Sequence, residues 1–161
     1  MQFEDFKKIL IGKFGEDVIV KENTVLIQPQ LTIAADKIHA VCLELRDHEN
    51  TFFDYLTCLS GLDNGPEKAM MEVVYHLYSI PFNHHLILKV ELPRETPTVP
   101  TVSDIWRSAD WHEREAYDMF GIIFANHPDL RRILLPADWE GFPLRKDYQE
   151  QELYHGIKVK Y

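Results

Sequence analysis

The residues of this sequence that could carry out chemistry are concentrated between positions 111 and 132. The run 111–121 (WHEREAYDMFG) is followed closely by 127–132 (HPDLRR). Acids, arginines, aromatic residues and a histidine at this density are typical of either a catalytic centre or a fixed interface. The two functions make different demands on the individual side chains, and the carboxylates distinguish them best.

The first of these segments is predicted to be a helix. Asp110 followed by Glu113 matches a capping box, which predicts a helix that begins at Trp111, and Gly121 is well placed to end it. At about 100° per residue, one arc of this helix is apolar and consists of Ala116, Tyr117, Met119 and Phe120. The opposite arc carries Arg114, Glu115 and Asp118, of which Arg114 and Asp118 have the spacing of an i,i+4 ion pair.

Glu113 is the unusual residue, because it falls within the apolar arc. A buried carboxylate must be protonated or paired, since isolated burial costs several kcal/mol. Possible cationic partners follow downstream at Arg131, Arg132, Arg145 and Lys146. Two interpretations stay open: an ion pair that pins the following segment onto the helix, or a general acid or base with a raised pKa.

A metal site is not supported by the spacing. His112 and Glu113 begin like an HExxH zinc motif, but Ala116 stands where the second histidine is required. His84 and His85 are adjacent, and neighbouring strand residues point to opposite faces. His127, which precedes a proline, is better suited to fixing a loop by hydrogen bonds.

Nucleophilic motifs are also missing. The sequence has no GxSxG elbow, no GxGxxG and no phosphate-binding loop, and Ser103 and Ser108 are predicted to start helices. An acid–base or metal hydrolase built on Glu113, Glu115 and His127 remains as the alternative to an interface.

The elements that must position these residues form an α+β fold. Helical periodicity predicts two N-terminal helices near 3–14 and 38–45. Strand patterns occur at 17–20, 24–28, 52–59, 71–78 and 86–92, of which the first two form a hairpin and the last three an antiparallel meander. We expect an antiparallel or mixed sheet of about five short strands, packed by the two helices, in a domain spanning 1–97.

Residues 98–161 are predicted to be short helices and an extended C-terminal arm. The proline-rich stretch 93–100 should interrupt all regular structure, and a turn cluster at 61–66 should end the third strand. The segment 133–148 (ILLPADWEGFPLRKDY) has neither helical nor strand periodicity. Its tryptophan, tyrosine and arginine are residue types that anchor interfaces. A loop wrapped on its own domain explains the composition equally well.

Composition excludes several classes of protein. The formal net charge of −9 disfavours binding to nucleic acid and to anionic lipid, so membrane contact is expected only through a protein partner. The two cysteines, Cys42 and Cys58, lie in apolar patterns and are predicted to be buried free thiols. With no clustered cysteines, no iron–sulfur cluster is expected on this chain. No apolar run reaches the roughly 20 residues needed to span a bilayer, and no signal peptide is visible.

Five ordered segments then point to a family: 113–115 (ERE), 118–122 (DMFGI), 127–134 (HPDLRRIL), 138–141 (DWEG) and 143–148 (PLRKDY). Over roughly residues 98 to 148 they resemble the 30-kilodalton, or C, subunit of respiratory complex I, the proton-translocating NADH:quinone oxidoreductase. The signature positions that the resemblance marks as interface residues are Glu113, Arg114, Glu115, Asp118, His127, Arg131, Arg132, Trp139, Leu144, Arg145, Lys146, Asp147 and Tyr148.

The resemblance implies a cofactor-free structural subunit of the hydrophilic arm, without an active site of its own. It implies packing against the 49-kilodalton (D) quinone-site subunit and near iron–sulfur subunits, with FMN, the clusters, NADH and quinone held by other subunits. The implied location is the cytoplasmic side of the bacterial inner membrane, as a peripheral part of the complex, and an organelle-encoded origin stays open. The equivalent module of a membrane-bound hydrogenase or of a ferredoxin-driven relative is the alternative.

The sequence departs from the family pattern at three positions. Asn126 stands where a glycine commonly precedes the His-Pro pair, Phe142 where a histidine is common, and Gln149 where a proline is frequent. We expect Asn126 to keep the turn, because asparagine tolerates a left-handed backbone. Phe142 removes any role that requires a titrating group there.

Overall fold

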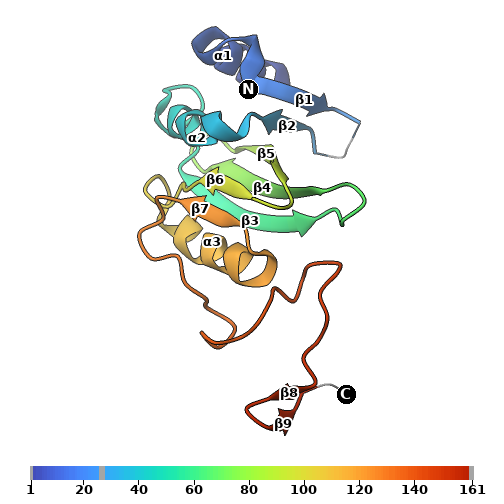
Figure 1. The fold of residues 1–161 in the computed structure, drawn as a ribbon. Helices are drawn as coiled ribbons and strands as arrows, with labels where there is room; N and C mark the ends of the chain where they lie inside the picture. Colours follow the sequence, from blue (N-terminus) through green and yellow to red (C-terminus); the bar gives the residue numbers. More distant parts are fainter. Residues whose placement is uncertain (1, 26–27, 160–161) are drawn as a thin grey trace.

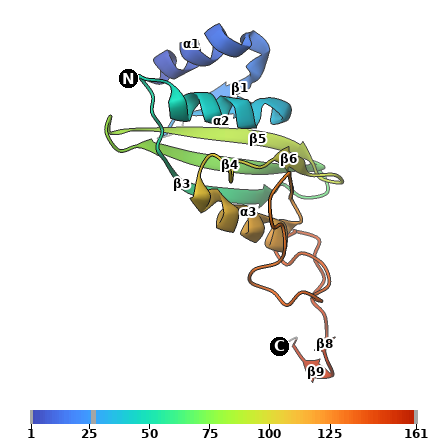
Figure 2. The ribbon, with the colours of Figure 1, turned by 90° about the vertical axis from the view of Figure 1, so that its left-hand side faces the viewer.

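The computed structural model describes residues 2–25 and 28–159. Its main sheet has five strands in the order β1-β2-β5-β4-β3, with α1 and α2 toward the β1–β2 end and α3 beside β3 (Figures 1 and 2). In chain order the elements are α1 Phe3–Phe14, η1 Glu16–Val18, β1 Ile19–Asn23, β2 Gln30–Ile33, η2 Ala35–Lys37, α2 Ile38–Asp47, β3 Tyr55–Asp63, β4 Met70–Ser79, β5 His84–Pro93, β6 Thr98–Pro100, α3 Arg107–Phe120, β7 Ile123–Ala125, β8 Leu153–Tyr154 and β9 Ile157–Lys158.

The α+β prediction and the antiparallel meander are confirmed. Strands β3, β4 and β5 pair antiparallel in sequence order, and β2 joins β5 in parallel, so the sheet is mixed. Strand β4 alternates regularly between buried and half-buried residues. That alternation turns one face of the sheet toward the core.

One hydrophobic core unites the helices and the sheet. Helices α1 and α2 contribute Phe6, Leu10, Ile38, Val41, Cys42 and Leu45, and the segment 99–124 contributes Val99, Val102, Ile105, Trp106, Ala109, Ala116, Ile122 and Phe124. The core therefore continues past position 98, and α3 is held in place by the same packing as the sheet. Both cysteines are free; Cys42 is buried, whereas Cys58 is only half-buried, contrary to the prediction.

One predicted strand lies elsewhere along the chain, and another is shifted by a few residues. The second strand of the first hairpin was expected at 24–28, but β2 runs Gln30–Ile33, and Val25 is 94% exposed. Leu26 and Ile27 lie outside the described residues. The predicted strand 52–59 begins later, at Tyr55, because the N–H groups of Phe52 and Phe53 donate back to the carbonyl oxygens of His48 and Leu45 at the end of α2.

Strand β3 also runs through Gly61, where a turn was expected. A Cβ at Gly61 would lie 2.9 Å from the Phe120 ring of α3, so glycine there serves close strand–helix packing.

The region after β5 is more regular than predicted. Residues 98–100 form β6, which pairs in parallel with β7, so the proline-rich connector is not free of structure. Helix α3 begins at Arg107 and not at Trp111, and within the described residues it is the one α-helix after position 98. The capping-box prediction is wrong because the Glu113 side chain bonds elsewhere. Ser108 lies inside α3, and Ser103 lies in the turn before it.

Beyond β7 the chain leaves the sheet as an arm without long elements and ends in the small β8–β9 hairpin, as Figures 1 and 2 show. Gly121 ends α3 in the left-handed region, at φ +74°. Asn126, at φ +64°, adopts the expected left-handed backbone. These two turns direct the arm back across α3.

Candidate interface site on the C-terminal arm

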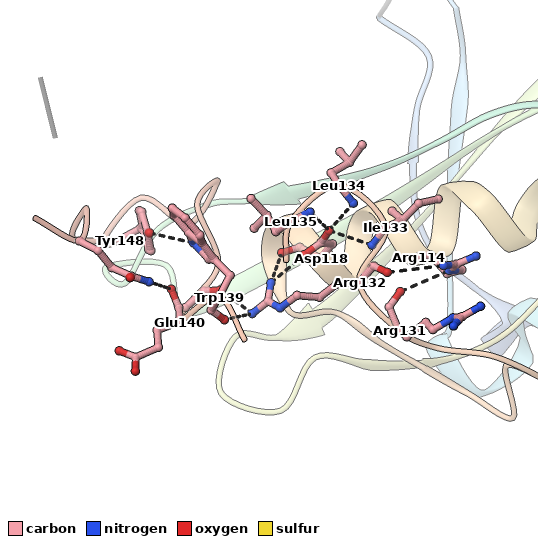
Figure 3. A network of polar contacts seen from close by, with 12 residues as sticks. Arg114, Asp118, Arg131, Arg132, Ile133, Leu134, Leu135, Trp139, Glu140 and Tyr148 are labelled. Carbon is pink, nitrogen blue, oxygen red and sulfur yellow. Dashed lines mark hydrogen bonds and ion pairs between the residues drawn. The ribbon is translucent and has the colours of Figure 1, made fainter. Parts of the chain in front are cut away.

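Asp118 of α3 holds the first part of the arm (Figure 3). Its side chain is fully buried. Oδ2 accepts hydrogen bonds from the backbone N–H groups of Ile133, Leu134 and Leu135 at 3.0, 2.8 and 2.9 Å. Oδ1 accepts one from Arg132 Nη1 at 2.7 Å. Burial by itself would raise the pKa of Asp118, but these donors outweigh it and hold the pKa below its usual range.

This arrangement corrects the prediction that Asp118, on the arc opposite the apolar one, pairs with Arg114. The arm covers that side of α3, and the arm's own N–H groups compensate the buried charge. Arg114 instead donates to the carbonyl oxygens of Arg131 at 3.3 Å and Arg132 at 3.5 Å. Helical periodicity could not reveal this, because the burial depends on a segment without periodicity.

Arg132 closes the next part of the arm into a loop. Its Nη2 donates to the carbonyl oxygens of Trp139 and Gly141, both at 2.9 Å, while Nη1 also reaches the Asp118 carbonyl at 3.1 Å. Trp139 Nε1 donates to Tyr148 Oη at 3.1 Å. The segment 132–148 is therefore crosslinked by polar contacts even though it has no regular secondary structure.

Asp63, at the end of β3, holds the far end of the arm. Its carboxylate accepts from Arg94 Nε at 2.8 Å, from the Gly65 N–H at 2.9 Å and from the Lys146 N–H at 2.9 Å. Arg94 also pairs with Asp147. The hydrogen bond from Arg94 holds the pKa of Asp63 well below its usual range. Neither Asp63 nor Arg94 was identified from the sequence, where both look like ordinary turn residues.

Glu113 faces inward as predicted, but its partners are not the arginines. Oε2 accepts from Thr101 Oγ1, and Oε1 accepts from the Val102 N–H at 2.8 Å. The nearest basic group is His127 Nε2, 3.8 Å from Oε2. Burial raises the pKa of Glu113 to about 7, against the lowering effect of the Thr101 and Val102 hydrogen bonds. Arg132 is unavailable because it binds Asp118 and the carbonyl oxygens of the arm, and Arg131 pairs with Asp129.

The hydrolase alternative is not supported by the geometry. Glu113 is fully buried, whereas Glu115 is exposed, so the two carboxylates share no cleft. His127 acts on its loop as predicted, because Nδ1 accepts from the Asp129 N–H at 3.0 Å and Nε2 approaches the Asp110 carbonyl at 3.3 Å. Within 2–25 and 28–159, no three His, Cys, Asp or Glu side chains gather in a group that could hold a metal ion.

The remaining signature residues occupy the outer side of the arm. Arg131 is exposed and pairs with Asp129 at 2.9 Å. The Leu144 N–H donates to the Met119 carbonyl at 3.0 Å, while 54% of the Leu144 residue surface stays exposed. Leu134 is 63% exposed although its backbone is fixed by Asp118. The anchored arm thus presents apolar side chains outward from a rigid backbone.

Comparisons with known proteins agree with the signature. The sequence profile of the family described as "Respiratory-chain NADH dehydrogenase, 30 Kd subunit" matches residues 31–153. The chain is 47% identical over 156 residues to the C subunit of the NADH-quinone oxidoreductase of Chloroherpeton thalassium, covering 96% of this chain but 64% of that protein. It is 46% identical over 150 residues to the corresponding C subunit of Chlorobium phaeobacteroides, covering 92% of this chain and 90% of that protein.

Two solved structures share the fold. A trypsin-resistant fragment (1–134) of Nqo5 aligns with a TM-score of 0.56 at 33% identity, over 68% of this chain and 87% of that one. A chain of an archaeal membrane-bound sulfane sulfur reductase aligns with a TM-score of 0.73 at 24% identity, over 91% of this chain and 85% of that one. At that identity the second likeness concerns the fold alone.

Proposed function

Since the chain belongs to the family of the 30-kilodalton subunit of respiratory-chain NADH dehydrogenase, we propose that it is a structural subunit of a NADH:quinone oxidoreductase. In this proposal it sits in the hydrophilic arm of that complex and packs against the 49-kilodalton (D) subunit and neighbouring iron–sulfur subunits. It supports electron transfer from NADH to quinone without an active site of its own. FMN, the iron–sulfur clusters, NADH and quinone are bound by the other subunits.

The observation that carries the proposal is the anchored arm. Two buried aspartates, Asp118 and Asp63, fix the arm to the domain at residues 133–135 and at Lys146. Between and beside these anchors, Leu134 and Leu144 are more than half exposed. A preorganised segment that exposes leucines lowers the entropic cost of association, which favours a permanent protein interface.

The proposed location is peripheral, on the cytoplasmic side of the membrane, with contact to the bilayer only through other subunits. Among residues 2–25 and 28–159, no helix combines the length and the apolar character that crossing a bilayer requires. The net charge of −9 disfavours direct attraction to anionic lipid.

Co-purification tests the proposal. With an affinity tag on the native chain, detergent-solubilised membranes should yield the 49-kilodalton and iron–sulfur subunits together with NADH-driven quinone reduction. Changing Leu134 and Leu144 to serine should weaken this co-purification and leave the isolated chain folded. Val20→Ser is the matched control, because Val20 is 54% exposed on β1, far along the sheet from the arm. Recovery of the tagged chain alone would contradict the proposal.

The same preparation decides the electron donor. An NADH-binding flavoprotein among the recovered proteins supports NADH:quinone oxidoreductase, the enzyme to which the relatives at 47% and 46% identity belong. Recovery with hydrogenase subunits, or turnover driven by ferredoxin and not by NADH, would instead assign the chain to the equivalent module of such a relative.

A further inference from the structure

Arg145 differs from Arg131 and Arg132 in that its guanidinium group forms no ion pair with a carboxylate of the described residues, although Arg132 also lies against the Phe142 ring. Its Nε donates to the Phe120 carbonyl at 2.6 Å, and its Cζ lies 4.8 Å from the centroid of the Phe142 ring. The ring and the carbonyl hold the group in one orientation. Gly121 leaves the space for it, since a Cβ there would lie 2.7 Å from Arg145 Nη2.

The outer nitrogens of this guanidinium have no acceptor among the described residues. Arg132 and Arg94 each bind buried carboxylates, at 2.7 and 2.8 Å. No carboxylate of the described chain lies within 4.0 Å of Arg145, and Arg94 is a like charge nearby. Partial burial and the like charge of Arg94 lower the pKa of Arg145, and they outweigh the opposite effect of Asp147 and Asp63, which lie near it without forming an ion pair.

The surroundings of Arg145 suit a protein partner better than a free anion. The preceding residue, Leu144, is 54% exposed and helps to line a hollow of about 320 Å³ between β3 and α3. Met119, Phe120 and Ala116 contribute apolar surface to the same hollow. Ser60, His112 and Glu115 add polar groups, so the hollow is of mixed character. A fixed arginine beside such a partly apolar hollow is typical of an interface hot spot.

We propose that Arg145 is a docking residue that accepts an Asp or Glu side chain of the adjacent subunit, with an apolar residue of the same partner segment covering Leu144. The pairing rests on the proposed function, because it assumes that another protein of the complex lies over the arm. Arg145 should prefer a carboxylate, since the two Nη groups of a fixed guanidinium can bind both carboxylate oxygens at once.

The first test is retention of the chain in the purified complex. Arg145→Gln removes the charge and should raise the rate of dissociation from the complex in moderate salt by about tenfold or more. Arg107→Gln is the matched control, because Arg107 is an exposed arginine at the opposite end of α3. Thermal unfolding of the isolated variants separates loss of docking from loss of folding, and equal unfolding temperatures are expected.

The second test identifies the partner group. Arg145→Lys places an amine at this position, and a carbodiimide should then link it covalently to the carboxylate that it meets in the assembled complex. Mass spectrometry of the crosslinked peptides should show an Asp or Glu of another subunit. Crosslinks confined to this chain would overturn the proposal. Retention of the unmodified chain only in the presence of inorganic phosphate would also overturn it, because Arg145 would then bind a free anion.

The two ideas fail in different ways. If the unmodified chain does not co-purify with a quinone-reducing complex, the proposed function fails. If the unmodified chain co-purifies and Arg145→Gln is retained equally well, the proposed function stands and the role of Arg145 is refuted.

Discussion

Replacing Asp118 by asparagine should detach the arm from α3. The substitution preserves shape, but it removes a fully buried charge that accepts three backbone N–H groups and one arginine hydrogen bond. Single hydrogen bonds to a charged group contribute about 1.5–3 kcal/mol each, and their sum overstates the loss because they share one carboxylate. The cost of breaking a buried ion pair, about 3–5 kcal/mol, is the better measure.

Two measurements report the loss of stability and the detachment of the arm in Asp118→Asn. Urea denaturation of the isolated chain should show a free energy of unfolding that is lower by about 3–5 kcal/mol, if arm and core unfold together. If the arm detaches first, limited proteolysis should cut between residues 133 and 148 in the variant and not in the unmodified chain. Either result shows that Asp118 fixes the arm to α3.

The pH dependence gives an independent check on the same residue. The folded pKa of Asp118 is lowered, so its contribution is fully present above the unfolded pKa, about 3.9, and is lost as pH falls through the folded value. The difference between the unmodified chain and Asp118→Asn should therefore shrink in acid. Asp129→Asn is the control, because Asp129 forms an exposed pair with Arg131 and should cost about 0–1 kcal/mol. The reasoning is refuted if the free energy of unfolding of Asp118→Asn lies within about 0.5 kcal/mol of that of the unmodified chain and the protease leaves its arm uncut.

Three further changes test the core beneath the arm. Burial raises the pKa of Glu113 to about 7 and so favours the protonated carboxyl group. Its contribution to the free energy of unfolding is complete below the unfolded pKa and is lost as pH rises to about 7. Glu113→Gln should abolish this pH-dependent loss of stability, on the order of 3 kcal/mol, in denaturation curves between pH 5 and 8. Tyr75→Phe should leave stability unchanged or raise it by about 1 kcal/mol in thermal unfolding, because the buried Tyr75 hydroxyl has no hydrogen-bond partner among the described residues; a clear loss would mean that the hydroxyl is bonded. Gly61→Ala should cost about 1–3 kcal/mol in the same assay, because the new Cβ would meet the Phe120 ring, and an unchanged unfolding temperature would disprove tight β3–α3 packing there.

The sequence predicted the parts of the fold that follow periodicity. The meander β3–β5, helices α1 and α2 and the inward position of Glu113 each depend on spacing within one segment. The exact start of α3 could not be predicted, because Glu113, which resembles a capping residue, bonds to Thr101 and Val102 in the loop between β6 and α3.

The anchors of the arm could not have been predicted in the same way. Asp118 and Asp63 are buried by contacts with residues 14 or more positions away, and those residues lie in a segment without a repeat. A charge pattern on one helix cannot show which acids will meet backbone N–H groups from elsewhere. The family resemblance marked Asp118 as important, but its partners came from the structure.

The position of Asp118 on α3 also bears on the order of events in biosynthesis. The carboxylate that organises residues 133–135 is aligned only when Ala109 and Ala116 have packed α3 into the core. Before the core forms, the leucines of the arm have no common geometry to offer another protein. The surface that the arm presents is thus coupled to the folding of the core, since residues 133–135 share one carboxylate only in a chain whose α3 is in place.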